Sequence, residues 1–115
     1  TVLLNENLTD PASPNKKYTY TADTIFDMNL VAHAINANLL YHEATYLQDQ
    51  SKKAAERFHA TTTQAATIAK EASVKRLLIG HFSSKYERID EHVKEAQTVF
   101  TSTDLALEGV TFLVQ

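Results

Sequence analysis

The residues Arg76-Leu77-Leu78-Ile79-Gly80-His81 form a short apolar run that ends in a glycine and a histidine. The residues Leu39-Leu40-Tyr41-His42-Glu43 have the same character and end in a histidine and a glutamate. Short apolar runs of this kind are typical of strands that a sheet buries on both faces. We therefore predict buried strands at 39–42 and 76–79, each with an ionisable side chain at or just after its end.

Segments with helical periodicity separate these strands. We expect helices at 24–37, 52–58, 61–72 and 89–100, and further strands at 17–20, 105–107 and 111–114. The residues Thr61-Thr62-Thr63-Gln64 have the spacing of a capping box, which sets the start of the third helix. The alternation of strand and helix predicts an α/β fold in which neighbouring strands of the main sheet run parallel, with 105–107 and 111–114 as a closing pair.

Three of the expected helices each have one apolar face, and we expect that face to be buried. The expected positions are Met28, Val31, Ala32 and Ile35 in the first helix, Ala65, Ile68, Ala69 and Ala72 in the third, and Ile89, Val93, Ala96 and Phe100 in the last. The face of the helix at 61–72 consists mainly of alanines, so it permits close packing.

The composition is that of one globular domain. The chain has 115 residues, 43% of them hydrophobic, and its 11 basic and 14 acidic side chains leave a net charge of −3. This balance excludes a generally basic nucleic-acid-binding protein, and no apolar run is long enough for a membrane span. Both prolines lie in a polar stretch at 5–16, so we predict a loop over residues 1–16 that leads into a domain at 17–115.

Two residue types are scarce. The 2 glycines cannot form a Gly-rich phosphate-binding loop, which excludes the common nucleotide-binding motifs. The absence of cysteine excludes disulfides, a thiol nucleophile and a thiolate metal site, and fits a cytoplasmic protein. Because the chain starts at Thr1 and not at Met, we expect it to be part of a longer protein.

Ionisable side chains follow three of the expected strands. Asp23 comes shortly after the first strand, His42 and Glu43 end the second, and His81 follows the third. Ligands of parallel α/β sheets bind at the carboxyl ends of the strands, so these groups can converge on one pocket. His59 lies just before the helix that starts at Thr61, and that loop can bring it to the same edge.

Each of these residues also has an ordinary structural interpretation. Asp23 directly precedes a helix and can cap it. The pair His42–Glu43 can be a local hydrogen-bonded pair, and His59 can border a helix. His81 can be a buried histidine with one backbone partner.

The other candidate groups are weaker. His33 and His92 lie inside expected helices, and we interpret them as surface or core residues. Ser83 and Ser84 follow His81, but no Gly-x-Ser-x-Gly turn presents either of them as a nucleophile.

Imidazole and carboxylate groups without thiolates suit a cation such as zinc, which activates water. Asp23 and His81 are the strongest candidate ligands in the sequence. A catalytic zinc usually has three protein ligands, so the remaining ligands have to come from elsewhere.

Four ordered motifs resemble the C-terminal part of ribonuclease Z, the tRNA 3′-processing endonuclease family of the metallo-β-lactamase superfamily. They are Lys17-Tyr18-Thr19-Tyr20-Thr21-Ala22-Asp23-Thr24, Tyr41-His42-Glu43-Ala44-Thr45-Tyr46, His59-Ala60-Thr61 with Gln64-Ala65-Ala66, and Leu78-Ile79-Gly80-His81-Phe82-Ser83-Ser84-Lys85-Tyr86. The match runs from about Leu8 to the C-terminus. Ala60 stands where the family usually has serine, and Lys85 where it usually has arginine.

The resemblance implies a role for six residues. Asp23 would bridge two zinc ions and His81 would bind one of them. Glu43 and His59 would form a proton-transferring pair near the leaving 3′ oxygen, as a histidine oriented by a carboxylate can do near neutral pH. Ser83 and Lys85 would contact the substrate phosphate.

The resemblance also implies what the chain lacks. The family's main metal motif, His-x-His-x-Asp-His, is not in this sequence. The expected fold is therefore the C-terminal half of a metallo-β-lactamase-type αββα sandwich, with one sheet and flanking helices. On its own this part should bind zinc weakly or not at all and cleave nothing. Its apolar sheet face should associate with the N-terminal half of the same protein or form a homodimer.

The leading hypothesis is a fragment of a zinc-dependent endoribonuclease that cleaves tRNA precursors at the 3′ end. One alternative is another hydrolase of the metallo-β-lactamase superfamily. The second alternative is a non-catalytic α/β interaction domain that has kept the scaffold.

Overall fold

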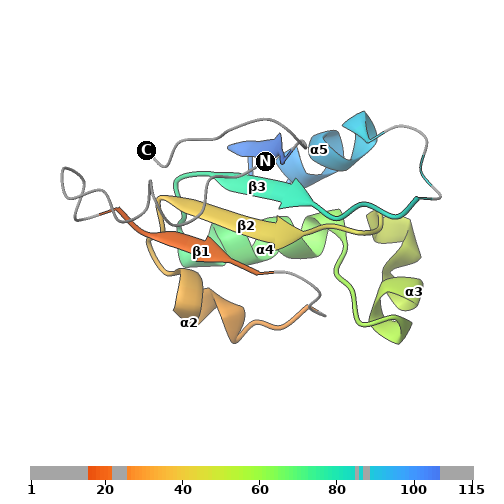
Figure 1. Cartoon of the computed structure of the whole chain (residues 1–115), viewed down its shortest axis with the longest axis horizontal. Helices are drawn as coiled ribbons and strands as arrows, with labels where there is room; N and C mark the ends of the chain where they lie inside the picture. The colour runs from red at the N-terminus through yellow and green to blue at the C-terminus, as the bar shows by residue number, and fades with distance from the viewer. Residues whose placement is uncertain (1–15, 22–25, 85, 87–88, 107–115) are drawn as a thin grey trace.

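The computed structural model describes residues 16–21, 26–84, 86 and 89–106, which form one sheet covered by helices (Figure 1). The strands are β1 (Tyr18–Tyr20), β2 (Leu39–Glu43), β3 (Leu77–Gly80) and β4 (Thr103–Leu105). They lie in the order β1-β2-β3-β4, and each pair of neighbours is parallel. The predicted α/β class and the parallel strands are confirmed.

The last strand differs from its prediction. β4 begins at Thr103, two residues before the predicted strand 105–107, and it pairs with β3. The backbone N–H of Leu77 donates to the carbonyl of Ser102 over 2.8 Å, and the N–H of Ala106 donates to the carbonyl of Ile79 over 2.8 Å. These bonds draw the segment into the parallel ladder. The predicted partner strand 111–114 lies outside the described residues.

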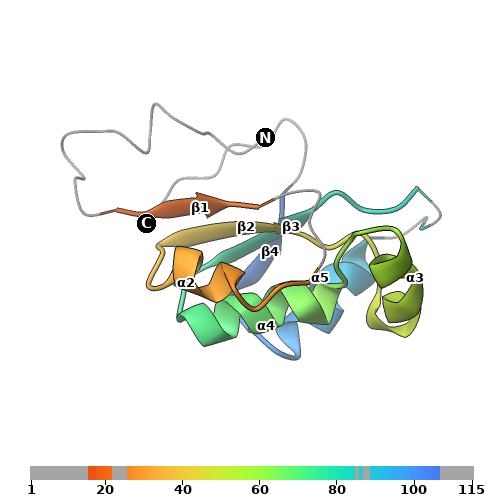
Figure 2. The ribbon, with the colours of Figure 1, turned by 90° about the horizontal axis from the view of Figure 1, so that it is seen from below.

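The helices α2 (Leu30–Ala34), α3 (Ser51–Glu56), α4 (Thr62–Ala72) and α5 (Asp90–Gln97) lie on one side of the sheet, as Figure 2 shows. A short 3-10 helix, η1 (Gln48–Gln50), precedes α3. This one-sided arrangement is the predicted single sheet with flanking helices.

The first helix is much shorter than predicted, and of its predicted face only Val31 packs against the core. The side chain of Asp27 accepts the N–H of Asn29 over 2.9 Å, so the chain turns there before it becomes helical. Asn36 adopts a left-handed backbone with φ 57°, which ends the helix. Met28 and Ile35 are therefore exposed, Ala32 is exposed as well, and Ala34 is the helix residue that is buried.

The helix α4 confirms its prediction closely. The Thr61 side chain accepts the N–H of Gln64, and the Gln64 side chain accepts the N–H of Thr61 over 2.9 Å, which is the predicted capping box. The four predicted positions of its apolar face are all fully buried: Ala65, Ile68, Ala69 and Ala72. Small side chains let this helix approach the sheet and its neighbouring helices closely.

The main core lies between the helices and the sheet. Leu40, Leu77 and Ile79 of the strands pack there with residues of α4 and with Ala96 of α5, which was predicted to be buried. Val93 and Phe100, from the same predicted face, pack against this core as half-buried residues. The fourth predicted position, Ile89, is also half-buried.

The other face of the sheet carries an aromatic cluster. Tyr18 and Tyr41 pack around the buried Leu39 and Leu78. The Tyr41 ring stacks on Tyr20, with 4.7 Å between the ring centroids and 13° between the planes. Gly80 makes room for Tyr41, since a Cβ there would lie 2.5 Å from the Tyr41 hydroxyl oxygen.

Two buried histidines belong to the core on the helix side. Burial lowers the pKa of His42, and the nearby backbone carbonyl of Glu43 opposes the shift. Burial also lowers the pKa of His92, whose ring makes edge contacts with Phe82 and Tyr86 at centroid distances of 4.8 and 4.6 Å. Both side chains are therefore held in the neutral form.

Within the described segments, every helix is too short or too polar to cross a bilayer.

We expect Thr61→Ala to lower the free energy of unfolding by about 1 kcal/mol, because the first turn of α4 loses its capping hydroxyl. Urea unfolding followed by circular dichroism measures the loss. Thr101→Ala is the matched control at an exposed position, and its effect should stay within about 0.5 kcal/mol. An equal loss in both variants would contradict the capping role.

We expect the burial of His42 and His92 to make the free energy of unfolding fall as the pH is lowered below about 6.5. Below it the unfolded chain binds protons at His42 and His92 that the folded chain does not bind. His92→Phe should weaken this pH dependence, measured by urea unfolding at a series of pH values from 7.5 to 5.5. His33→Phe, at an exposed histidine, should leave the dependence unchanged.

Candidate active site

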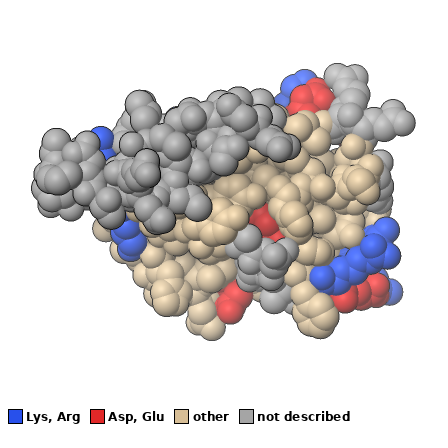
Figure 3. All heavy atoms as spheres, in the orientation of Figure 1, with Lys and Arg blue, Asp and Glu red and all other residues tan. Residues whose placement is uncertain are grey.

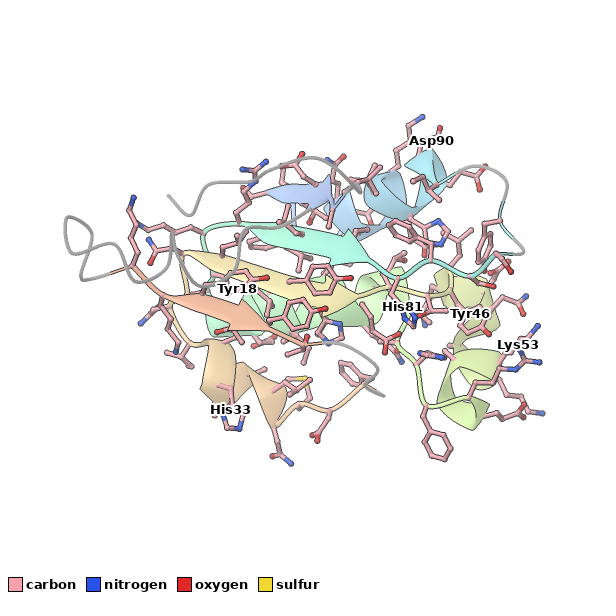
Figure 4. All side chains as sticks on the ribbon, viewed as in Figure 1. Tyr18, His33, Tyr46, Lys53, His81 and Asp90 are labelled. Atoms are coloured by element: carbon pink, nitrogen blue, oxygen red, sulfur yellow. The ribbon has the colours of Figure 1, made fainter. Side chains whose placement is uncertain are left out.

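The segment that follows β2 lies between two others at the carboxyl end of the sheet. On one side, the N–H of Ala44 donates to the carbonyl of Gly80 over 2.8 Å, and the N–H of Ser83 donates to the carbonyl of Thr45 over 2.9 Å. On the other side, the N–H of Thr62 donates to the carbonyl of Tyr46 over 3.0 Å. Residues 43–46 are thereby held between 59–62 and 80–83, and Figure 4 shows Tyr46 and His81 at this end of the sheet.

Glu43 is the centre of this arrangement. Its side chain is fully buried, and its Oε2 accepts the Thr45 hydroxyl over 2.6 Å. The same oxygen lies 2.9 Å from Nδ1 of His59 and accepts the N–H of Ala60 over 3.4 Å. Several donors around one oxygen stabilise a buried carboxylate that would otherwise be costly to remove from water.

His59 is presented by a sharp turn after α3. Phe58 has a left-handed backbone with φ 59°, and the N–H of His59 donates to the carbonyl of Ala54 over 2.8 Å. Because a carboxylate can only accept, the contact with Glu43 places a proton on Nδ1 of His59. In the neutral ring the lone pair then lies on Nε2. The side chain is 24% exposed, so the imidazole is accessible from solvent.

His81 occupies the turn at the end of β3. Its backbone is left-handed, with φ 61°, which is an uncommon conformation for a residue other than glycine. Its Nδ1 lies 3.3 Å from the Thr45 hydroxyl oxygen and 3.8 Å from Oε2 of Glu43. The rings of His59 and His81 have centroids 5.3 Å apart, so both imidazoles border the same small space.

Glu43, His59 and His81 each offer one ligand atom, and these three atoms lie within 4.8 Å of one another. Two imidazoles and a carboxylate suit zinc or a similar cation. The Glu43 carboxylate, however, accepts bonds from Thr45, His59 and Ala60, so it is better suited to orienting a histidine than to binding a metal directly.

The predicted site residues have different outcomes. The structure brings Glu43, His59 and His81 together. Asp23 and Lys85 lie outside the described residues, so their roles remain predictions. Ser83 is half-buried beside the site, and its backbone N–H bonds to Thr45.

The structure also places the three histidines outside this group, His33, His42 and His92. His42 does not join the site, because alternate residues of a strand point to opposite faces. Its Nδ1 lies 2.8 Å from the backbone oxygen of Glu43, not from the carboxylate. His33 is a surface residue and His92 is a core residue, as interpreted.

Thr45 is the site residue to which the sequence analysis assigned no role. The sequence feature that indicates a role for Thr45 is its spacing of two residues from Glu43. Residues two apart in an extended segment point to the same side, so a hydroxyl at position 45 can reach the side chain at position 43.

A shallow hollow over α3 lies beside the site and carries both signs of charge. It is lined by Asp49, Gln50, Lys52, Lys53, Glu56 and Arg57. Figure 3 shows blue and red side chains side by side there. Lys53 places its Nζ 5.8 Å from the centroid of the Tyr46 ring. The mixture of signs does not by itself indicate a nucleic-acid surface.

Known proteins similar to this chain include ribonuclease Z sequences. The ribonuclease Z of Bacteroides fragilis is 45% identical over 109 residues, which are 95% of this chain and 36% of that protein. The chain thus spans about a third of the length of the curated relatives it matches. No protein-family model matches it.

Solved structures agree with the sequence relatives. The metallo-β-lactamase fold protein YhfI from Bacillus subtilis superposes with a TM-score of 0.78 at 31% identity, covering 84% of this chain and 40% of that one. The short form of human tRNase Z gives a TM-score of 0.69 at 28% identity, covering 90% of this chain and 35% of that one. The chain is therefore homologous to about a third of ribonuclease Z and has, over that span, the metallo-β-lactamase fold.

Proposed function

We propose that this chain is part of a zinc-dependent endoribonuclease that cleaves tRNA precursors at their 3′ end. The observation that carries the proposal is the contact of the buried Glu43 carboxylate with His59, beside His81. The 45% identity to a ribonuclease Z supports the choice of reaction. Phosphodiester hydrolysis needs a proton donor for the leaving oxygen, and this pair is suited to supply one.

His59 is the proton-transferring residue of this proposal. The carboxylate of Glu43 holds the Nδ1–H of His59 at 2.9 Å, which orients the ring. Nε2 can then carry the proton that the leaving 3′ ribose oxygen takes up. Glu43 acts through His59 and does not itself contact the substrate.

Asp23 and His81 are the metal ligands of the proposal, in a two-metal centre that other parts of the protein complete. Zinc, when bound, supplies Lewis acidity toward the phosphate and a nucleophile from water at neutral pH. The nitrogen and oxygen donors without thiolate fit this metal. Ser83 and Lys85 are the proposed phosphate contacts. We expect the chain alone to bind zinc weakly and to be inactive.

The aromatic sheet face supports an N-terminal partner from the same protein. The described helices cover the opposite face, while Tyr18, Tyr20 and Tyr41 lie on this one. The relatives are long enough to provide a second sheet that packs on it. A preparation of this chain alone should use the same face to form a homodimer. The proposed place of action is the cytoplasm, where precursor tRNA is the substrate.

The proposal is testable in a chimera, in which this chain replaces the matching third of the Bacteroides fragilis ribonuclease Z. We expect the chimera to cleave precursor tRNA at the 3′ end. His59→Ala should lower kcat by about 10²–10⁴-fold, because a general acid is lost. The exposed His33→Ala is the control and should retain activity. A folded, metal-loaded chimera that cleaves no precursor tRNA would instead favour another hydrolase, consistent with the similarity to YhfI, or an interaction domain.

Metal content separates the roles of the two histidines. In the same chimera, His81→Ala should lower the zinc bound per chain, since a ligand is removed. His59→Ala should leave it unchanged, because the ring acts on the proton. Atomic absorption of dialysed protein measures both values. Loss of zinc in His59→Ala would show that His59 is a ligand and not the proton donor.

A further inference from the structure

We propose that Thr45 is a positioning residue that fixes the proton of His81 on Nδ1 and thereby directs the Nε2 lone pair to the metal. This inference deepens the proposed function, since it assumes that His81 is a ligand. The tautomer itself follows from the contacts of this chain and can be measured without metal.

The direction of the hydrogen bonds determines the tautomer. A hydroxyl has a single hydrogen, and Thr45 directs it to Oε2 of Glu43 over 2.6 Å, because a carboxylate can only accept. The Thr45 oxygen can then act only as an acceptor toward Nδ1 of His81, 3.3 Å away. Nδ1 must therefore carry the hydrogen. A neutral imidazole has one N–H, so Nε2 carries the lone pair.

The backbone keeps the two partners in place. The carbonyl of Thr45 accepts the N–H of Ser83 over 2.9 Å, so the turn that begins at His81 is tied to Thr45 from both the side chain and the main chain. Thr45 is only 5% exposed, so water does not readily replace its hydroxyl. The left-handed backbone of His81 is part of the same turn.

One carboxylate oxygen thus determines which nitrogen carries the proton in both imidazoles. Oε2 of Glu43 accepts directly from His59 and, through the Thr45 hydroxyl, orients the proton of His81. Histidines that bind metals nearly always donate their second ring N–H to such a partner, and loss of the partner weakens metal binding. Thr45 links the proton-transferring pair to the metal-binding side of the site.

Nitrogen NMR of histidine-labelled protein tests the tautomer in the chain as it is, without metal and at pH 8. Long-range ¹H–¹⁵N correlations distinguish Nδ1–H from Nε2–H. Wild-type chain and Thr45→Ser should show the Nδ1–H pattern for His81, and Thr45→Val should lose it. His59 should keep its Nδ1–H pattern in all of them, because it bonds to Glu43 directly.

Thr103→Val is the matched control, since Thr103 is also a buried threonine with a bonded hydroxyl but lies on β4. It should leave the His81 pattern unchanged. A wild-type His81 with the Nε2–H pattern would overturn the proposal, and this result is decisive even if Thr45→Val does not fold. A folded Thr45→Val that retains the Nδ1–H pattern would overturn it equally.

Zinc titration of the chimera tests the consequence for the metal. Thr45→Val should weaken zinc binding by about 10–100-fold, and Thr45→Ser should restore it. Unchanged zinc affinity together with an altered tautomer would overturn the metal-directing role. A chimera that binds zinc as expected but cleaves no precursor tRNA would contradict the proposed reaction and leave the role of Thr45 intact.

Discussion

The burial of the Glu43 carboxylate is the constraint on which the site depends. A fully buried charge is tolerated only when donors surround it, and here three donors come from two segments of the chain. Thr45 supplies a hydroxyl, His59 an imidazole N–H and Ala60 a main-chain N–H. Any fold that keeps Glu43 buried must therefore keep the loop at 59–60 against the end of β2.

The parallel sheet and the start of α4 hold these segments against Glu43. The hydrogen bonds between β2 and β3 continue beyond the strands, which places Thr45 beside the turn at His81. The capping box begins α4 at Thr61, directly after Ala60, so the loop with His59 has little freedom. Strand pairing and helix capping together assemble a site from segments that are far apart in the sequence.

The chemistry of this site depends on which ring nitrogen of His59 and of His81 carries the proton. Two imidazoles border one space, and a single carboxylate oxygen lies near both. This arrangement gives the two rings a defined orientation. It does so although the chain spans only about a third of the length of its ribonuclease Z relatives. Under the proposed function, this arrangement would serve proton transfer and a metal ligation that other segments complete.

The sequence by itself determined the α/β class, the buried strands near 39–42 and 76–79, the start of α4 and the candidates Glu43, His59 and His81. Apolar runs, cap spacing and motifs are local properties, so they can be recognised without a structure. The short α2 was predicted wrongly because turns at Asp27 and Asn36 compete with helix periodicity.

Only the tertiary structure decided that His42 points away from the site and that Thr45 lies between Glu43 and His81. The first outcome depends on the face that His42 takes on β2, and the second on which distant segment packs beside the residues that follow β2. Such contacts form between residues 36 positions apart, as Thr45 and His81 are. The local spacing of residues 43 and 45 indicates that their side chains can meet, but no local feature indicates the contact of Thr45 with His81.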